Sequence, residues 1–260
     1  MYKVLVIAGT TDAKHIIDRL LENNLGVAAT VTTRLGSELL KSSGDIDIYE
    51  GRITQRRMAS LLEKLNPICL VDASNPFAMD ISRNAMNVCS KFNTPYIRFK
   101  REEIPYEEKD VIKVKDYEDA YKALLQFKDN IMLTVGSRKI DIFTKLPEYK
   151  ERVYLRVLPD CKVIGKCEKL GFNAKNLLAI KGPFNEELNI ELMKYCKATV
   201  IVTKESGNTG GISEKINAAK KMNIPIIMIE RAELECENNV STFSEILDYI
   251  NELLLVASNA

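Results

Sequence analysis

The segment TVIVTKESGNTGGISEKINAAKKMNIPIIMIER, residues 199–231, decides the fold class. It opens with an apolar run rich in β-branched residues and passes through a loop of charged, hydroxyl and glycine residues. Apolar residues at helical spacing follow, and a second apolar run ends the segment. Near-continuous apolar strands joined through a helix are typical of a parallel sheet with both faces covered. The segment therefore predicts a β-strand, an α-helix and a parallel β-strand.

The same alternation extends along the whole chain, with helix-period stretches between short apolar runs. We expect a last amphipathic helix at about 242–256. The predicted strands lie in runs 3–9, 27–33, 68–74, 95–99, 131–137, 152–159, 177–182, 199–206 and 225–231. This pattern predicts an α/β protein with doubly wound parallel sheets.

The two halves of the sequence are also similar to each other. Segments 72–101 and 203–231 share the order strand, polar turn, Ile-Ser, helix, Asn-x-Pro, strand and arginine. Pro95 and Pro225 are 130 positions apart, as are Arg101 and Arg231. We therefore predict two Rossmann-like domains, 1–128 and 129–260, with a cleft between the carboxyl ends of their strands.

Composition excludes several classes of function. The 260 residues carry 37 Lys and Arg against 36 Asp and Glu, so no broad field favours nucleic acid as a partner. No apolar run approaches the roughly 20 residues that cross a bilayer. A single histidine is too little for a zinc site or a Ser-His-Asp triad. The six cysteines contain no CxxC pair, which favours small buried thiols over disulfides or metal ligands. We expect a cytoplasmic protein without metal or membrane partners; oligomeric state cannot be deduced.

Candidate ligand loops follow the predicted strands, because ligands of open parallel sheets bind beyond the carboxyl ends of the strands. Gly9, Thr10 and Thr11 suit a phosphate cradle at a helix N-terminus, although a plain turn with a threonine cap has the same sequence. Thr33 and Arg34 stand where a dinucleotide fold carries its ribose-binding acid. An arginine there favours NADP over NAD, although a surface arginine has the same pattern.

Polar and basic residues follow other strands. Asp72, Ser74 and Asn75 suit either a ligand or a capped helix start. Cations beside strand ends of both halves would line one cleft with positive charge, as an anionic ligand requires. These are Arg98 and Arg101 in the first half, and Arg138 after Gly136 and Ser137 in the second.

The glycine-rich loop of segment 199–231 carries the densest chemistry. Lys204 and Glu205 end the strand, and Lys215 lies in the first turns of the helix. A plain turn needs one glycine, whereas three glycines among charged residues indicate that the backbone approaches a ligand closely. The ligand contacts predicted here are Lys204, Ser206, Gly207, Gly210, Gly211 and Lys215.

Six motifs, in this order and at these distances, resemble the precorrin-6A reductase family of cobalamin biosynthesis, in both its oxygen-dependent and its cobalt branches. The similarity covers residues 3 to about 232, and KESG followed by GG and EK is its most distinctive part. The motifs are GTTDAK, DASNPFA, TVGSR, RVLP, KGPFNEELN and VTKESGNTGGISEKINAA.

The resemblance implies an NAD(P)H-dependent reductase that saturates one double bond of a corrin-type macrocycle, with NADPH or NADH as cofactor. The substrate would be an anionic tetrapyrrole derivative, whose carboxylates explain the arginines and lysines. The implied cofactor-binding residues are Gly9, Thr10, Thr11, Thr33, Arg34, Ser74, Asn75, Gly136 and Ser137. The implied substrate-binding residues are Arg98, Arg101, Arg138, Lys204, Ser206, Gly207, Gly210, Gly211 and Lys215.

The chain departs from the family pattern in two loops. Ala8-Gly9 replaces a glycine pair, and Asn75 replaces a histidine in a motif that is commonly Asp-Ala-Thr-His-Pro. Because an asparagine does not titrate near neutral pH, the proton could come from Asp72, from Glu205 or from water. A non-catalytic nucleotide sensor and a methyltransferase of the same pathway remain alternatives.

Overall fold

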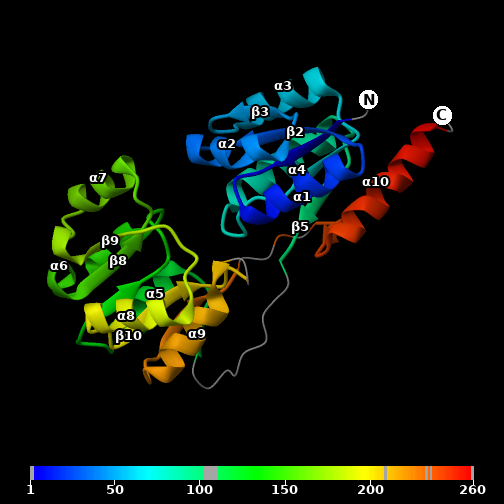
Figure 1. The fold of residues 1–260 in the computed structure, drawn as a ribbon. Helices are drawn as coiled ribbons and strands as arrows, with labels where there is room; N and C mark the ends of the chain where they lie inside the picture. Colours follow the sequence, from blue (N-terminus) through cyan, green and yellow to red (C-terminus); the bar gives the residue numbers. More distant parts are fainter. Residues whose placement is uncertain (1–2, 102–110, 208–209, 232–233, 235, 259–260) are drawn as a thin grey trace. The chain divides into compact units, whose positions relative to one another are not determined.

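The computed structural model describes residues 3–101, 111–207, 210–231, 234 and 236–258 (Figure 1). The chain divides into two compact units, Met1–Glu102 with Ala232–Ala260, and Glu103–Arg231. Each unit contains one six-stranded sheet, and every pair of neighbouring strands is parallel. The predicted α/β class with two parallel sheets is confirmed.

The first sheet has the order β12-β5-β4-β1-β2-β3. Its strands are β1 (Lys3–Ile7), β2 (Gly26–Val31), β3 (Asp47–Glu50), β4 (Cys69–Asp72), β5 (Tyr96–Phe99) and β12 (Asn239–Val240). The second sheet has the order β6-β11-β10-β7-β8-β9. Its strands are β6 (Val111–Val114), β7 (Ile131–Leu133), β8 (Val153–Val157), β9 (Leu177–Ala179), β10 (Val200–Lys204) and β11 (Ile226–Ile229).

Both sheets have the strand order of a dinucleotide-binding fold, in which the direction of winding reverses beside the first strand. The reversal lies between β1 and β4 in the first sheet and between β7 and β10 in the second. Ligands of such sheets bind at the reversal point, outside the carboxyl ends of the strands. The loops after these four strands are therefore where a site is expected, and they carry most of the predicted residues.

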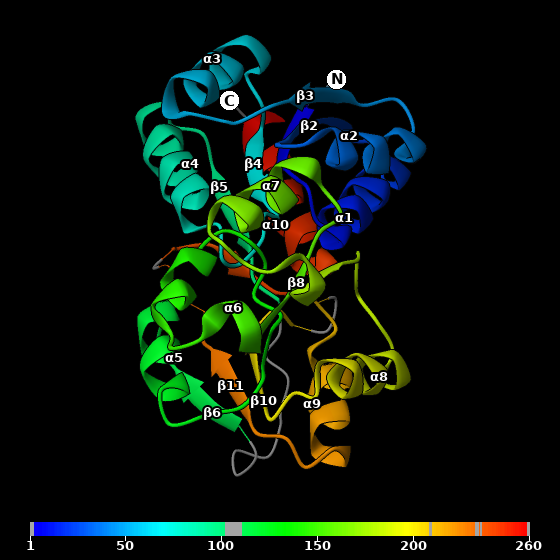
Figure 2. The same cartoon turned by 90° about the vertical axis from the view of Figure 1, so that its left-hand side faces the viewer.

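Helices cover both faces of the first sheet, as Figure 2 shows for α3 and α4 on one side and α1 and α2 on the other. Val4 and Val6 pack with α1, α2 and α10, whereas Leu5 and Ile7 pack with α3 and α4. This alternation is the period-2 pattern of a strand buried on both faces. The helices are α1 (Thr11–Glu22), α2 (Arg34–Leu40), α3 (Gln55–Leu65), α4 (Met79–Lys91) and α10 (Phe243–Ser258).

The second sheet is covered in the same way. Met132, Ile201 and Met228 pack against α8 and α9 in one apolar cluster. The helices of this unit are α5 (Tyr117–Leu124), α6 (Tyr149–Arg152), α7 (Cys161–Lys169), α8 (Glu186–Cys196) and α9 (Ile212–Lys221). A 3-10 helix, η3 (Ile140–Lys145), follows the loop after β7.

The observed division differs from the predicted boundary at residue 128. β6 pairs with β11 of the second sheet, and β12 pairs with β5 of the first. Ile246 and Ile250 of α10 are fully buried in the core of the first unit. Because these contacts join segments far apart in the sequence, the boundaries fall near residues 102 and 231. The predicted cleft is a property of neither unit alone and stays a prediction.

Cys69, Cys89, Cys167 and Cys196 are buried free thiols as predicted, whereas Cys161 is exposed and Cys236 is only partly buried, contrary to the prediction. Burial raises the pKa of Cys69 to about 12, so this thiol stays protonated at neutral pH. Among the described residues, no helix has the length and apolar character needed to cross a membrane, and no group of three acidic, histidine or cysteine side chains could hold a metal ion.

Candidate functional site

The loop after β1 contains Gly9, whose φ of +108° favours glycine. A Cβ built there meets no atom within 4 Å, so the backbone borders open space. Thr10 caps α1 by accepting a hydrogen bond from Ala13 N at 3.0 Å, and its hydroxyl donates to Ala73 O at 2.9 Å. Thr11 is exposed in the first turn of α1. Thr10 thus joins the loops after β1 and β4, on either side of the reversal point.

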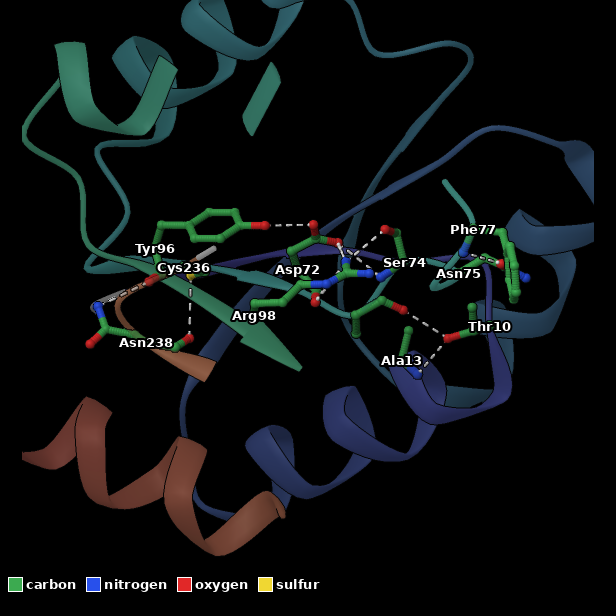
Figure 3. A network of polar contacts seen from close by, with 11 residues as sticks. Thr10, Ala13, Asp72, Ser74, Asn75, Phe77, Tyr96, Arg98, Cys236 and Asn238 are labelled. Carbon is green, nitrogen blue, oxygen red and sulfur yellow. Dashed lines mark hydrogen bonds and ion pairs between the residues drawn. The ribbon is translucent and has the colours of Figure 1, made fainter. Parts of the chain in front are cut away.

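Asp72 ends β4 and is completely buried. Its Oδ1 lies 2.7 Å from Arg98 Nη1 and accepts a hydrogen bond from Ser74 N at 3.0 Å. Its Oδ2 accepts from the Tyr96 hydroxyl at 2.7 Å, and Figure 3 shows the carboxylate between these partners. Burial, and then the charge of Asp72, hold the pKa of Tyr96 far above its usual range. Both oxygens of this proton-donor candidate are therefore engaged inside the protein.

The two arginines predicted to bind substrate in the first unit each contact a carboxylate of that unit. Arg98 is buried, and besides Asp72 its Nη1 donates to Ser74 Oγ at 3.0 Å (Figure 3). Arg101 donates from Nε to Asp12 Oδ2 at 2.6 Å, and both side chains are about 12% exposed. These arginines stiffen the strand ends of the first sheet, and their predicted role toward substrate gains no support from this geometry.

The remaining predicted residues of the first unit lie near the surface. Asn75 is exposed, and its Oδ1 accepts a hydrogen bond from Phe77 N at 2.9 Å, which closes the turn before α4. Thr33 caps α2 by accepting from Gly36 N. The Arg34 side chain is 86% exposed and contacts Glu38 across one helical turn at 3.1 Å. Exposed pairs of this kind contribute little, so Arg34 is available to a ligand phosphate.

In the second unit, the loop after β7 carries Gly136, Ser137 and Arg138. Gly136 has a φ of +74°, and a Cβ built there meets no atom within 4 Å, as at Gly9. Lys166 of α7 donates from Nζ to the carbonyl oxygens of Ser137 and Arg138 at 2.7 and 2.8 Å. Lys166 lies six residues beyond the N-cap of α7 and was not among the residues predicted from the sequence. This lysine fixes the backbone that carries Arg138.

Four cations gather at the carboxyl edge of the second sheet, and we call them the basic cluster: Arg138, Arg156, Lys204 and Lys215. Arg138 follows β7, Arg156 is the penultimate residue of β8 and Lys204 ends β10. Burial and then the charge of Arg138 lower the pKa of Lys204 to about 8. Burial and a neighbouring positive charge both disfavour the charged form of a lysine.

Arg156 is the residue of the basic cluster that the sequence analysis missed, although the RVLP motif contains it. Its Nη1 donates to Asn189 Oδ1 at 2.9 Å, and its guanidinium carbon lies 5.0 Å from the centre of the Phe184 ring. A guanidinium over a ring face is a cation–π contact, which holds the side chain without neutralising it. Burial lowers the pKa of Arg156 to about 10, so it remains charged at neutral pH.

Lys215 of α9 is 4% exposed. Its ammonium donates to Gly210 O at 3.0 Å. Burial, followed by the charges of Arg156 and Lys204, lowers its pKa to about 7, although Glu214 opposes the shift. This lysine is therefore only partly charged at neutral pH in the free protein.

Two glycines of the loop after β10 have positive φ, and one of them packs against the loop after β9. Gly207 has a φ of +72°, and its carbonyl accepts from Gly210 N at 3.0 Å. Gly211 has a φ of +65°, and a Cβ there would lie 3.1 Å from Pro183 Cβ. The loops after β9 and β10 therefore approach each other closely at Gly211, where an added Cβ would make a tight contact. Ser206 is partly buried in the same loop, whose Asn208 and Thr209 lie outside the described residues.

Glu205, the other proton-donor candidate, is held by Arg231. Arg231 Nε donates to Glu205 O at 2.9 Å and lies 4.0 Å from its Oε2. Both side chains are mostly buried. Arg231 and Arg101 follow equivalent strands, β11 and β5, and each contacts an acidic residue. The two arginines are therefore equivalent, but their partners are not, because Asp12 follows β1 and Glu205 follows β10, the counterpart of β4.

Known proteins similar to this chain cover nearly its full length. A cobalt-precorrin-6A reductase of Priestia megaterium is 35% identical over 246 residues, which are 94% of this chain and 96% of that protein. The cobalt-precorrin-6A reductase of Methanothermobacter thermautotrophicus is also 35% identical, over 97% of this chain and 84% of its own. The solved structure of CobK precorrin-6A reductase superposes with a TM-score of 0.79 over 97% of this chain and 98% of its own.

That structural match has 21% sequence identity and by itself shows a shared fold. A family model described as precorrin-6x reductase CbiJ/CobK matches residues 3–251, which include both sheets and every loop of the candidate site. The resemblance inferred from the motifs is thus confirmed over nearly the whole sequence. The chain belongs to the precorrin-6x reductase CbiJ/CobK family.

Proposed function

We propose that the protein reduces precorrin-6A or its cobalt form in cobalamin synthesis, with NADPH or NADH as the hydride source. Family membership and the names of the two relatives at 35% identity support the reaction class. The relatives are named for the cobalt substrate, which favours that branch. The hydride would go to one carbon of a ring double bond and a proton to its neighbour.

The observation that carries the proposal is the basic cluster. Arg156, Lys204 and Lys215 are largely buried cations whose pKa values are all lowered by burial. Several cations at one edge of a sheet suit a ligand that carries several negative charges. A macrocycle with acetate and propionate side chains supplies carboxylates at several positions, and arginine binds them through two parallel hydrogen bonds. The carboxyl edge of the second sheet is therefore proposed as the substrate site.

The first sheet suits the nicotinamide cofactor. The open space beside Gly9 and the exposed Thr11 at the N-terminus of the 12-residue helix α1 fit a pyrophosphate, which accepts hydrogen bonds from backbone N–H groups. Arg34 is placed to take a ribose phosphate. When bound, the cofactor supplies the hydride. Ser74 and Asn75 border the same strand ends, whereas Gly136 and Ser137, also predicted for the cofactor, belong to the second unit.

The proton has a different source from the two carboxylates predicted from sequence. Asp72 contacts Arg98, and Glu205 contacts Arg231. Each carboxylate thus already has a mostly buried arginine of its own unit beside it. Water that enters with the substrate is therefore the proposed proton donor.

The test is anaerobic turnover with each reduced nicotinamide and with both cobalt-free and cobalt-bearing precorrin-6A. We expect transfer of deuterium from C4 of the labelled nicotinamide to the product, as detected by mass spectrometry. Arg156→Met should lower kcat/KM at least tenfold, mostly through KM, because it removes a carboxylate partner. Lys169→Met, at an exposed position of α7, is the matched control and should leave kcat/KM unchanged.

Two other outcomes would replace this proposal. Nicotinamide binding without turnover on any fresh substrate would indicate a nucleotide sensor. Binding of S-adenosylmethionine with no affinity for a nicotinamide would indicate a group-transfer enzyme of the same pathway.

A further inference from the structure

Apolar side chains are exposed at the carboxyl ends of β8 and β9. Leu158 directly follows β8 and is 50% exposed, and Ile180 directly follows β9 and is 37% exposed. The two positions are neighbours, because Val157 pairs with Ala179 and Ile180 N donates to Val157 O at 3.0 Å. Figure 1 shows β8 and β9 side by side. Pro159, Ala179 and Pro183 are exposed as well. We call these five residues the apolar ledge.

Turn chemistry accounts for Pro159 and Pro183, whereas neither a turn nor the core accounts for the exposed side chains of Leu158 and Ile180. A loop at a strand end is normally polar, and exposed apolar area costs about 25 cal/mol per Å². Clustered apolar residues on a soluble protein mark a place where another molecule binds. In a parallel sheet, the carboxyl end of the strands is the place where small ligands bind. The position of the ledge therefore indicates a small ligand with an apolar surface.

The apolar ledge adjoins the basic cluster. Arg156 is the penultimate residue of β8 and stands two residues before Leu158, which follows the strand. Phe184, which follows Pro183 in the chain, lies under the guanidinium of Arg156. Pro183 also lies against Gly211, at the start of the helix that carries Lys215. Charge and apolar surface thus meet at one edge of one sheet.

We infer that the apolar ledge contacts the face of the substrate ring while the basic cluster binds its carboxylates. This inference rests on the proposed function and adds a specificity-determining surface to it. A small open-chain polycarboxylate satisfies the cations alone, whereas a flat macrocycle also covers Leu158 and Ile180. The ledge therefore selects ring-shaped polycarboxylates over linear ones of similar charge.

The test compares the double variant Leu158→Ser/Ile180→Ser with the unmodified protein. The probes are uroporphyrin, a flat macrocycle with many carboxylates, and citrate, a small open-chain polycarboxylate. Loss of two apolar contacts should weaken uroporphyrin binding about tenfold or more and leave citrate binding unchanged. Leu125→Ser is the matched control, because Leu125 is also 50% exposed in the second unit but follows α5. The conservative variant Leu158→Met/Ile180→Val should retain most of the affinity.

Equal uroporphyrin affinity in the serine variant and the unmodified protein would overturn the inference. So would an equal loss for uroporphyrin and citrate, because that result indicates damage to the basic cluster. The readout needs no turnover, so it separates the two proposals. If both proteins reduce precorrin-6A with the same KM, the inference about the apolar ledge is wrong and the proposed function is supported. If uroporphyrin binding depends on the apolar ledge but no turnover is seen with precorrin-6A, the inference about the ledge is supported and the proposed function is wrong.

Discussion

The ammonium group of Lys215 donates to Gly210 O over 3.0 Å, so a buried cation of α9 holds the glycine-rich loop that precedes the helix. The cations Arg156 and Lys204 and the carboxylate of Glu214 act on the same ammonium. The lysine thus has a local structural contact and an unfavourable electrostatic environment. An anionic ligand would offset the repulsion between Lys215 and its neighbouring cations, and the hydrogen bond to Gly210 O could remain.

Replacing Lys215 by methionine should stabilise the protein and weaken substrate binding. Methionine keeps the length of the side chain and removes a buried charge, which should raise the free energy of unfolding by about 1–4 kcal/mol at pH 7. Denaturant unfolding measures this change, and KM for the macrocycle should rise at least tenfold. Lys194→Met is the control, because its exposed pair with Glu191 should matter by less than about 1 kcal/mol. Loss of stability in Lys215→Met would contradict the assignment of the lysine as a destabilising cation.

Stability should also depend on pH through Lys215. Its pKa is about 7 in the folded protein, against about 10.4 in an unfolded chain. Between these values the unfolded state holds the extra proton, so the free energy of unfolding rises with pH. Lys215→Met should flatten this rise, as measured by unfolding at a series of pH values. If the free energy of unfolding of Lys215→Met rose with pH as steeply as that of the unmodified protein, the prediction would be wrong. Lys215 would then not change its charge between the two pKa values.

Binding of an anionic macrocycle should show the opposite trend with pH. Below about pH 7 both Lys215 and Lys204 are charged in the free protein and the affinity is highest. Above about pH 8 each must gain a proton to pair with a carboxylate, so the affinity falls by up to tenfold per pH unit for each lysine. Calorimetry in buffers of different ionisation enthalpy should detect this uptake of protons. Proton release, or no exchange at pH 8, would contradict the prediction.

A methyl group at Gly211 should separate the loops after β9 and β10. The φ of +65° is unfavourable for alanine, and the added Cβ would lie 3.1 Å from Pro183 Cβ. Gly211→Ala should lower the free energy of unfolding by about 1–2 kcal/mol and raise KM for the macrocycle. Gly165→Ala is the matched control: this glycine lies inside α7 with nothing within 4 Å of the added Cβ. That change should stabilise the protein by about 0.5–1 kcal/mol.

Periodicity identified nine strands because each is an apolar run, and all of them except the edge strand β9 are largely buried. It missed three. β3 and β6 are edge strands in which exposed polar residues interrupt the apolar pattern, and β12 has two residues. Edge strands are buried on fewer sides, so their sequences carry a weaker signal. Because β6 and β12 were not predicted, the sequence did not show that β6 joins the second sheet and β12 the first. The domain boundary was therefore predicted at residue 128.

The predicted site residues lie at or near strand ends, and their roles toward a ligand stay predictions. Arg138, Lys204 and Lys215 meet in one cluster because the reversal point of the sheet brings their loops together. Sequence does not reveal that Arg98 faces Asp72, since that pairing depends on the register of β4 against β5. Arg156 was missed because a single arginine in an apolar strand has the pattern of a solvated edge residue. In the sequence, Arg156 stands between the apolar residues Leu155 and Val157, which are buried, and this alternation could have pointed to it.

Arg34 should determine the choice between the two nicotinamide cofactors. The side chain is exposed, and its pair with Glu38 is weak enough to yield to a phosphate. Arg34→Ala should raise KM for NADPH about tenfold and leave KM for NADH nearly unchanged. Glu38→Gln, which removes the competing carboxylate, should lower KM for NADPH slightly. Equal effects of Arg34→Ala on both cofactors would mean that the ribose phosphate binds elsewhere.

Asp72→Asn should unfold the first unit more readily and should have little effect on the chemistry of the folded protein. The substitution leaves the buried guanidinium of Arg98 without its carboxylate, which costs about 3–5 kcal/mol. Arg98→Met in the same chain should restore part of the loss, and the double-mutant cycle measures the coupling. Glu38→Gln, at the exposed pair with Arg34, should change the free energy of unfolding by less than about 1 kcal/mol. If Asp72 were instead the proton donor, folded Asp72→Asn would show kcat reduced by several orders of magnitude with KM unchanged, and the double variant would recover stability without activity.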